Sequence, residues 1–227
     1  MGILKKTLQK YLPEQAANFF RQNEIKKEYE SWHILEEKLK SEWEKDENYV
    51  PVPHFVKENA IRKAAAKYKI KTLVETGTYL GFMLDSLKDD FDHLASIELS
   101  EPLYRRAVEK FAAYPGIKIY NGDSAKLLPI AIKDIREKCL FWLDGHYSGG
   151  VTSKADVETP ILAELQTVFS HPVKDHLIMI DDARLFIGTR DYPTIEELKK
   201  YISKFSGDYH LAIKYDIIFL YNAEIPF

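Results

Sequence analysis

Residues 72–81 read TLVETGTYLG, an apolar run that passes into a turn containing two glycines. We interpret Thr72–Glu75 as a strand and Glu75–Gly81 as the turn that follows it. Glycine after a strand permits a tight turn and allows a ligand to approach the backbone N–H groups closely. Turns between strands and helices also contain glycine for structural reasons alone, so this stretch by itself leaves ligand binding open.

The alternation of apolar runs and helical segments continues to the end of the chain. Six further runs are expected to be strands: Leu94–Glu98, Ile117–Tyr120, Leu140–Asp144, Leu177–Asp181, His210–Lys214 and Ile217–Tyr221. Helical segments separate the first five runs of the series, which is typical of a parallel sheet with helices on both faces. The last two runs leave no room for a helix between them. The predicted fold is therefore a doubly wound α/β sheet of seven strands, mostly parallel, with an antiparallel C-terminal hairpin.

Capping residues indicate where individual helices begin and end. Ser100 predicts the capped start of a helix that Pro115 ends. Thr194, with Glu197 three residues later, fits a capping box at the start of the last helix.

The first fifty residues differ in pattern from the rest of the chain. Apolar residues recur there at intervals of three and four: Ile25, Tyr29, Trp32, Leu35, Leu39 and Trp43. This is the stripe of an amphipathic helix, which the prolines at positions 51 and 53 prevent from continuing. We expect a helical extension over residues 1–50 and the main domain over residues 51–227. The helix is interpreted as a cap packed on the domain, with homodimerisation or a lid over a substrate pocket as alternatives.

Composition limits the classes of function that the chain can serve. Of its 227 residues 45% are hydrophobic, enough for a core, and the net charge of −3 argues against coating nucleic acid or an anionic membrane surface. The single cysteine, Cys139, excludes an intramolecular disulfide and a cysteine-based zinc cluster. No apolar run approaches the roughly 20 residues that span a bilayer, and the start lacks the apolar stretch of a signal peptide. We expect a soluble, cytoplasmic protein.

Polar residues follow the predicted strands at their carboxyl ends, where ligands of open parallel sheets bind. Glu98 lies 98 − 77 = 21 residues beyond Gly77. Nucleotide-binding folds place an acid about 20 residues past the glycine turn, where it accepts hydrogen bonds from a ribose diol. Asp123, after the third strand, is a candidate partner for the exocyclic amine of adenine or simply a cap of the next helix.

Three carboxylates follow the fourth and fifth strands. Asp144, Asp181 and Asp182 should lie at neighbouring strand ends and repel one another unless a cation joins them. Oxygen ligands suit Mg²⁺, Mn²⁺ or Ca²⁺ rather than zinc. The alternative is that one aspartate caps a helix and Arg184 neutralises another.

These features together resemble a known family. Residues 51–222 are similar to class I S-adenosylmethionine-dependent methyltransferases, in particular to a small bacterial group. The motifs that carry the resemblance are ETGTYLG at 75–81, IELS at 97–100, GDS at 122–124, FWLDGHYSGG at 141–150 and IDDAR at 180–184. The resemblance implies a Rossmann-like sheet whose seventh strand is inserted between the fifth and the sixth.

The resemblance also implies a cofactor, S-adenosyl-L-methionine, and the residues that hold it. The turn after the first strand would hold the methionine part through Glu75, Thr76, Gly77, Thr78, Tyr79 and Gly81. Glu98 would bind the ribose hydroxyls, and Asp123 with Ser124 would bind the adenine. Tyr79 stands where the family usually has its middle glycine, and we expect its side chain to crowd the methionine end of the pocket.

The reaction that the resemblance implies is O-methylation of a small hydroxylated acceptor, with a sugar or glycan unit as one candidate. Asp144, Asp181 and Asp182 would hold a divalent metal, with Mg²⁺, Mn²⁺ and Ca²⁺ as candidates, as acids do in comparable methyltransferases. His146 is the candidate general base and acts together with Asp144. The partner would be a small molecule, with no role for nucleic acid or membrane.

Two other classes of function remain as alternatives. One is a metal-dependent hydrolase that uses Asp144, His146, Asp181 and Asp182 without the cofactor. The other is a non-catalytic module that keeps the cofactor pocket while the N-terminal helix recruits a partner.

Overall fold

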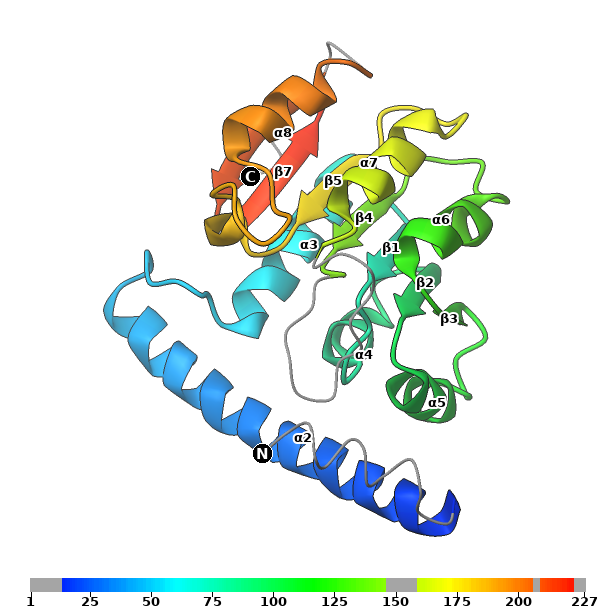
Figure 1. Cartoon of the computed structure of the whole chain (residues 1–227). Coiled ribbons are helices and arrows are strands. Elements are labelled where there is room, and N and C mark those ends of the chain that lie inside the picture. The colour runs from blue at the N-terminus through cyan, green and yellow to red at the C-terminus, as the bar shows by residue number, and fades with distance from the viewer. Residues whose placement is uncertain (1–13, 146–158, 206–208, 223–227) are drawn as a thin grey trace.

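The computed structural model of the chain describes residues 14–145, 159–205 and 209–222. Within these residues lies one sheet of seven strands in the order β3-β2-β1-β4-β5-β7-β6. The strands are β1 Thr72–Thr76, β2 His93–Glu98, β3 Ile117–Asn121, β4 Leu140–Leu143, β5 Leu177–Ile180, β6 His210–Lys214 and β7 Ile217–Tyr221. Neighbours among β1–β5 pair in parallel, whereas β7 runs antiparallel to both β5 and β6 (Figure 1). The predicted sheet, hairpin and position of the seventh strand are confirmed.

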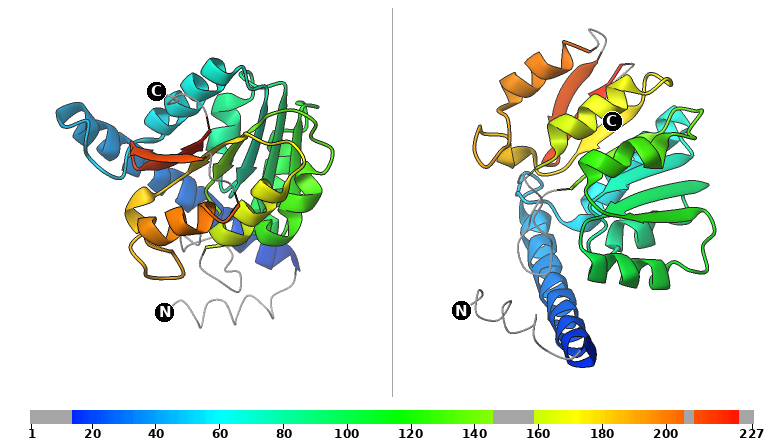
Figure 2. Two further views of the ribbon diagram at one scale, coloured as in Figure 1. Left: turned by 90° about the horizontal axis from the view of Figure 1, so that it is seen from above. Right: turned by 45° about the vertical axis from the view of Figure 1, so that its right-hand side comes forward.

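Two layers of helices cover the two faces of the sheet (Figure 2). The helices are α2 Glu14–Lys45, α3 His54–Tyr68, α4 Phe82–Leu87, α5 Glu101–Lys110, α6 Ser124–Ile132, α7 Ile161–Ser170, the 3₁₀ turn η1 Ala183–Leu185 and α8 Ile195–Ile202. Side chains of α3, α4 and α5 form one core with the sheet. Side chains of α6, α7 and α8 form the other. The doubly wound arrangement is therefore confirmed.

The central strands are apolar without interruption because both of their faces are covered. Successive side chains of a strand point to opposite faces. On β1, Leu73 belongs to the core under α3–α5 and Val74 to the core under α6–α8, and neither is exposed to solvent. This is the burial that continuous apolar runs predict for parallel strands.

Both predicted helix starts agree with the structure, whereas one predicted helix end differs. Thr194 and Glu197 form the expected capping box at the start of α8. Ser100 occupies the N-cap position of α5, but its side chain makes no capping hydrogen bond to the helix. α5 ends at Lys110, before the predicted stop at Pro115, because the chain turns at Phe111 and buries that ring in the core.

The N-terminal helix α2 packs on the rest of the chain near both of its ends (Figure 1). Ile25 packs with Leu80 and Leu103, close to the turn after β1 and to α5. Trp43 packs with Val52 and lies edge-on to an aromatic ring of the β6–β7 hairpin. The predicted amphipathic stripe is therefore buried in the chain's own fold at Ile25, Leu39 and Trp43, whereas Leu35 is 48% exposed. Homodimerisation through this helix stays a prediction.

None of the helices in the described part of the chain combines the length and the apolar character needed to cross a bilayer.

Candidate functional site

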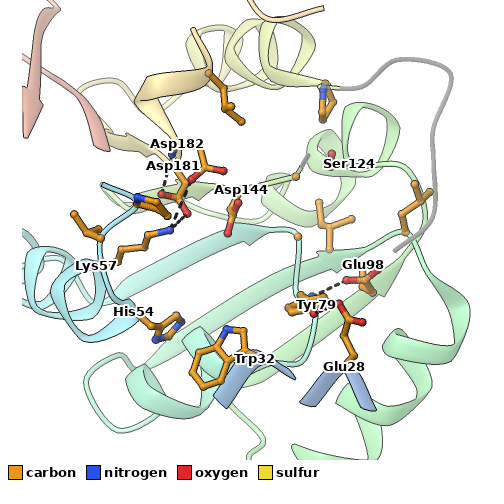
Figure 3. A pocket seen from close by; sticks show the side chains of 18 of the residues that line it. Glu28, Trp32, His54, Lys57, Tyr79, Glu98, Ser124, Asp144, Asp181 and Asp182 are labelled. Carbon is orange, nitrogen blue, oxygen red and sulfur yellow. Dashed lines mark hydrogen bonds and ion pairs between the residues drawn. The ribbon is translucent and has the colours of Figure 1, made fainter. Parts of the chain in front are cut away.

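A cavity of about 580 Å³ opens where the parallel strands β1, β2, β4 and β5 end (Figure 3). Gly77 and Glu98 line it from the first two of these strand ends. Asp144 and Asp181 line it from the other two. α2 contributes the facing wall, with Trp32 among the lining residues. The volume lies within the range of about 300–1,000 Å³ that is usual for small-molecule sites.

Glu98 is held rigidly at the end of β2. Its Oε2 accepts the N–H of Tyr79 at 2.8 Å, and its Oε1 accepts the N–H of Ser100 at 2.7 Å. Burial raises the pKa of the carboxyl above its ordinary value, while these backbone donors pull it back. Because a carboxylate offers about four lone-pair sites, each oxygen keeps capacity for one more donor from the cavity.

Gly77 is required by the close approach of two backbone segments. A Cβ atom at this position would lie 2.4 Å from the carbonyl oxygen of Asp144, and the residue has φ +85°. A side chain therefore cannot be placed between the ends of β1 and β4 without moving the backbone. At Gly77 the cavity is therefore lined by backbone peptide groups rather than by a side chain.

Tyr79 adopts a left-handed backbone conformation with φ 50°, which glycine adopts more readily than a residue with a side chain. Its side chain lines the cavity and reaches α2, where the hydroxyl donates to Glu28 Oε1 at 2.7 Å. Burial, together with the neighbouring Glu28, raises the pKa of this hydroxyl above its ordinary value. The residue therefore ties the turn after β1 to the N-terminal helix.

Four of the predicted cofactor residues do not line the cavity: Glu75, Thr76, Thr78 and Gly81. The Glu75 carboxyl is buried beneath the turn, where it accepts the Ser96 hydroxyl at 2.5 Å. Ser96 also shares a hydrogen bond with Thr78 at 2.6 Å. Burial raises the pKa of Glu75 to about 8, with Asp144 and Glu98 adding to the effect. Glu75 and Thr78 therefore support the turn through hydrogen bonds to Ser96 and do not face the cavity.

A second buried carboxyl, on α7, was missed by the sequence analysis. The Oε1 atom of Glu164 lies 3.1 Å from the position that a Cβ atom on Gly145 would occupy, and the Thr76 and Ser124 hydroxyl oxygens lie at 3.1 and 3.3 Å from the same point. Burial raises the pKa of Glu164 to about 7. Glu164 is the single charged residue of a mostly apolar helix, and nothing in the sequence indicated that its side chain lies beside Gly145.

Asp123 and Ser124 line the cavity beside the start of α6. Asp123 Oδ1 accepts the N–H of Ala125 at 3.0 Å, so the side chain caps the helix. Of the two predicted roles of Asp123, the capping role is the one present in the structure. Recognition of adenine by this residue stays a prediction.

The strand-end aspartates are paired with cations from two other elements (Figure 3). Lys57 on α3 lies 2.5 Å from Asp181 Oδ2 and 3.9 Å from Asp182 Oδ1. Arg184 lies 2.6 Å from Asp182 Oδ1. The predicted neutralisation of one aspartate by Arg184 is therefore present. Lys57 was not predicted, because it lies in a different part of the sequence from its partners.

The predicted metal ligands Asp144, Asp181 and Asp182 all line the cavity, and a metal bound to them stays a prediction. Among the described residues, no group of three or more His, Cys, Asp or Glu side chains is arranged to hold a metal ion. At Asp181 and Asp182, Lys57 and Arg184 contact carboxylate oxygens that a metal would otherwise use. His146, the predicted general base, lies outside the described residues.

α2 supplies aromatic and acidic groups to the cavity wall. Trp32 stacks on Phe82 with ring centroids 3.7 Å apart. Glu36 Oε2 accepts the N–H of His54 at 2.8 Å and so fixes the start of α3 to α2. Both α2 residues line the cavity, and Trp32 belongs to the stripe that the sequence predicts. The sequence predicted that the N-terminal helix could cover a substrate pocket, but it did not predict these individual contacts.

Comparisons with known proteins bear on the fold. No family model and no curated protein matches the chain. Among solved structures, a candidate caffeoyl-CoA O-methyltransferase from Staphylococcus aureus has a TM-score of 0.54 at 15% identity, over 83% of this chain and 92% of that one. The methyltransferase PaMTH1 from Podospora anserina, bound to SAH, has a TM-score of 0.52 at 14% identity, over 82% and 88%. An O-methyltransferase from Bacillus cereus in complex with SAH has a TM-score of 0.53 at 9% identity, over 82% and 90%.

At 9–15% sequence identity, the similarity to these three structures shows the fold alone. The strand order, the antiparallel β7 and the helical layers on both faces agree with it. The chain has the Rossmann-like α/β fold of the methyltransferases.

Proposed function

We propose that the protein is an S-adenosylmethionine-dependent methyltransferase that acts on a small hydroxylated acceptor. The observation that carries the proposal is the pairing of Gly77 and Glu98 at one cavity, at adjacent strand ends of a methyltransferase fold. The neighbouring structures from Podospora anserina and Bacillus cereus are described with SAH bound, which supports the choice of cofactor.

The residues present fit an adenosyl sulfonium ligand. Glu98 is fixed by two backbone N–H groups and retains lone pairs for ribose hydroxyls. The Gly77 turn presents backbone where a side chain would block the approach. Carboxylates on several sides of the cavity favour a cation over a pyrophosphate. Ser124, beside the cap residue Asp123, is the proposed contact for the adenine edge.

When bound, the cofactor supplies an electrophilic methyl group. The chain's own task is to hold the acceptor in line and to remove its proton. Asp144 lines the cavity at the end of β4, together with Gly77 and Lys57. We assign proton removal from the acceptor to Asp144, with His146 as its proposed partner.

The cavity wall supports a small acceptor with both apolar and hydroxyl groups. Trp32, Leu39 and Val52 provide apolar surface. Glu28 and Glu36 of α2 line the same space and are acceptors for hydroxyl groups. A sugar unit presents this combination of faces. The cytoplasmic location and the lack of a nucleic-acid partner stay predictions from composition.

Calorimetric titration with S-adenosylhomocysteine tests the cofactor assignment. We expect one-to-one binding to the wild-type chain and a loss of about 1.5–3 kcal/mol in binding free energy for Glu98→Ala, the usual contribution of hydrogen bonds to a charged group. Asp134→Ala, a substitution on the loop after α6, serves as the matched control and should bind as the wild type does. Unchanged affinity in Glu98→Ala would reject the assignment of Glu98 to the ribose.

A further inference from the structure

Lys57 is the one cation, among the described residues, that the structure ion-pairs with both aspartates at the end of β5. Its Nζ lies 2.5 Å from Asp181 Oδ2 and 3.9 Å from Asp182 Oδ1. The side chain of Lys57 is 14% exposed and that of Asp181 is 3% exposed, so the pair is shielded from water. Lys57 nevertheless lines the cavity, and Figure 3 shows its ammonium directed at the aspartates.

Lysine and arginine partly neutralise the carboxylates of this cluster. Burial by itself would lower the pKa of Lys57, but Asp181, Asp144 and Asp182 together raise it above the ordinary lysine value. Arg184 compensates Asp182 from the other side and also pairs with Asp216.

Three of the aspartate oxygens that a divalent cation would use already have partners. Asp181 Oδ2 faces Lys57, and Asp181 Oδ1 accepts the N–H of Asp182 at 2.8 Å. Asp182 Oδ1 is shared between Arg184 and Lys57. Mg²⁺ requires near-octahedral oxygen coordination, and it would have an ammonium group as a neighbour within the same cluster. The residues present therefore do not fit a divalent metal.

We propose that Lys57 takes the place of a divalent metal in this site, so that acceptor binding and proton removal proceed without one. This inference rests on the proposed methyltransferase function and deepens it. An ammonium has three donors, of which one is directed at Asp181, so Lys57 retains donors for an oxygen in the cavity. The positive charge at this position favours an acceptor whose oxygen becomes negative as its proton leaves.

The wild-type chain provides the first test. Mn²⁺ binding is measured by electron paramagnetic resonance and by calorimetry, and S-adenosylhomocysteine is titrated in the same samples. We expect no saturable one-to-one Mn²⁺ site at millimolar metal, and S-adenosylhomocysteine affinity that is the same with Mg²⁺ or with a chelator. One-to-one Mn²⁺ binding that disappears in Asp181→Asn and Asp182→Asn would overturn the proposal.

Variants of Lys57 provide the second test. Lys57→Met removes the charge and leaves the carboxylates together, and we expect its Mn²⁺ affinity to rise by at least about tenfold. Lys57→Arg keeps the charge, and Lys57→Met/Asp181→Asn removes one carboxylate as well, so neither should gain Mn²⁺ binding. A folded Lys57→Met that gains no Mn²⁺ affinity would show that the lysine does not exclude the metal, against the proposal.

The two tests separate this inference from the function on which it rests. If Lys57→Met does not fold, the wild-type Mn²⁺ titration decides the question alone. A wild-type chain that binds no S-adenosylhomocysteine would reject the methyltransferase proposal, whereas a wild-type Mn²⁺ site with intact S-adenosylhomocysteine binding would reject only the role of Lys57.

Discussion

Replacing Tyr79 by phenylalanine should loosen α2 from the turn after β1 while leaving the sheet intact. The substitution removes the hydroxyl that donates to Glu28 Oε1 at 2.7 Å. The phenylalanine ring keeps the packing of this residue against Leu80 and Ile25. The backbone conformation at φ 50° is unchanged in cost, because both residues are aromatic.

The size of the effect follows from the exposure of the pair. A hydrogen bond to a charged group contributes about 1.5–3 kcal/mol when it is buried. Tyr79 and Glu28 are both half-buried, so solvent screening reduces the expected loss to about 1 kcal/mol. A loss of this size increases the population in which α2 has opened by about fivefold.

Amide hydrogen exchange of the native protein measures this opening directly. We expect the amides of α2 around Glu28 to exchange about fivefold faster in Tyr79→Phe, with the amides of β1 and β4 unchanged. Tyr120→Phe on β3, where the tyrosine packs in the core under α6–α8, is the matched control and should leave α2 unchanged. A Glu28→Ala variant combined with Tyr79→Phe should show less than additive effects. Unchanged exchange in α2, or equal acceleration throughout the sheet, would refute the reasoning.

Three further substitutions or conditions have outcomes that the structure specifies. Gly77→Ala should lower the free energy of unfolding by about 3 kcal/mol and abolish S-adenosylhomocysteine binding, because its Cβ would lie 2.4 Å from the Asp144 carbonyl oxygen. Urea unfolding measures the stability and calorimetry measures the binding. A variant as stable as the wild type would contradict the steric argument. Burial, with His171, lowers the pKa of His176 from 6.5 to about 4, so the folded state binds fewer protons than the unfolded state. As the pH is lowered from 6.5 to 4, the free energy of unfolding should therefore fall by up to about 1.4 kcal/mol per pH unit. His176→Asn should flatten that slope. Burial raises the pKa of Glu164 to about 7, so the stability contributed by its protonated carboxyl is present below the unfolded-state pKa and is lost as the pH rises through 7. Glu164→Gln should therefore be more stable than the wild type in urea unfolding at about pH 8. Equal stability would show that the carboxyl ionises without cost.

Local sequence patterns predicted the fold because they reflect burial within one element. Leu73 and Val74 are apolar in succession because each faces a separate core. The antiparallel end of the sheet followed from the two residues, Tyr215 and Asp216, that separate β6 from β7. Both have positive φ, as two-residue hairpin turns require.

The cavity was predicted in part because strand ends meet at one edge of a parallel sheet. Glu98 and Asp144 were found from their positions after apolar runs, and the structure brings both to the cavity. The depth of a side chain below that edge has no signature in the sequence. Glu75 is therefore buried under the turn rather than exposed to the cavity, although it belongs to the same motif.

The interactions that sequence reasoning missed join residues that are distant in the chain. Lys57 pairs with Asp181 across 124 positions, and Tyr79 pairs with Glu28 across 51. Each of these side chains reads locally as part of a solvated helix face or a turn. Only the packing of α2 and α3 against the strand ends determines which charges meet.

A crystal structure of the protein grown with S-adenosylhomocysteine would test the central assignment most directly, through the distance from the Glu98 carboxylate oxygens to the ribose hydroxyls. We expect an adenosyl group between the Gly77 turn and Glu98, with both ribose hydroxyls within a hydrogen-bond distance of about 2.5–3.0 Å from the carboxylate. A ligand bound elsewhere on the molecule, or an empty cavity at saturating ligand, would contradict it.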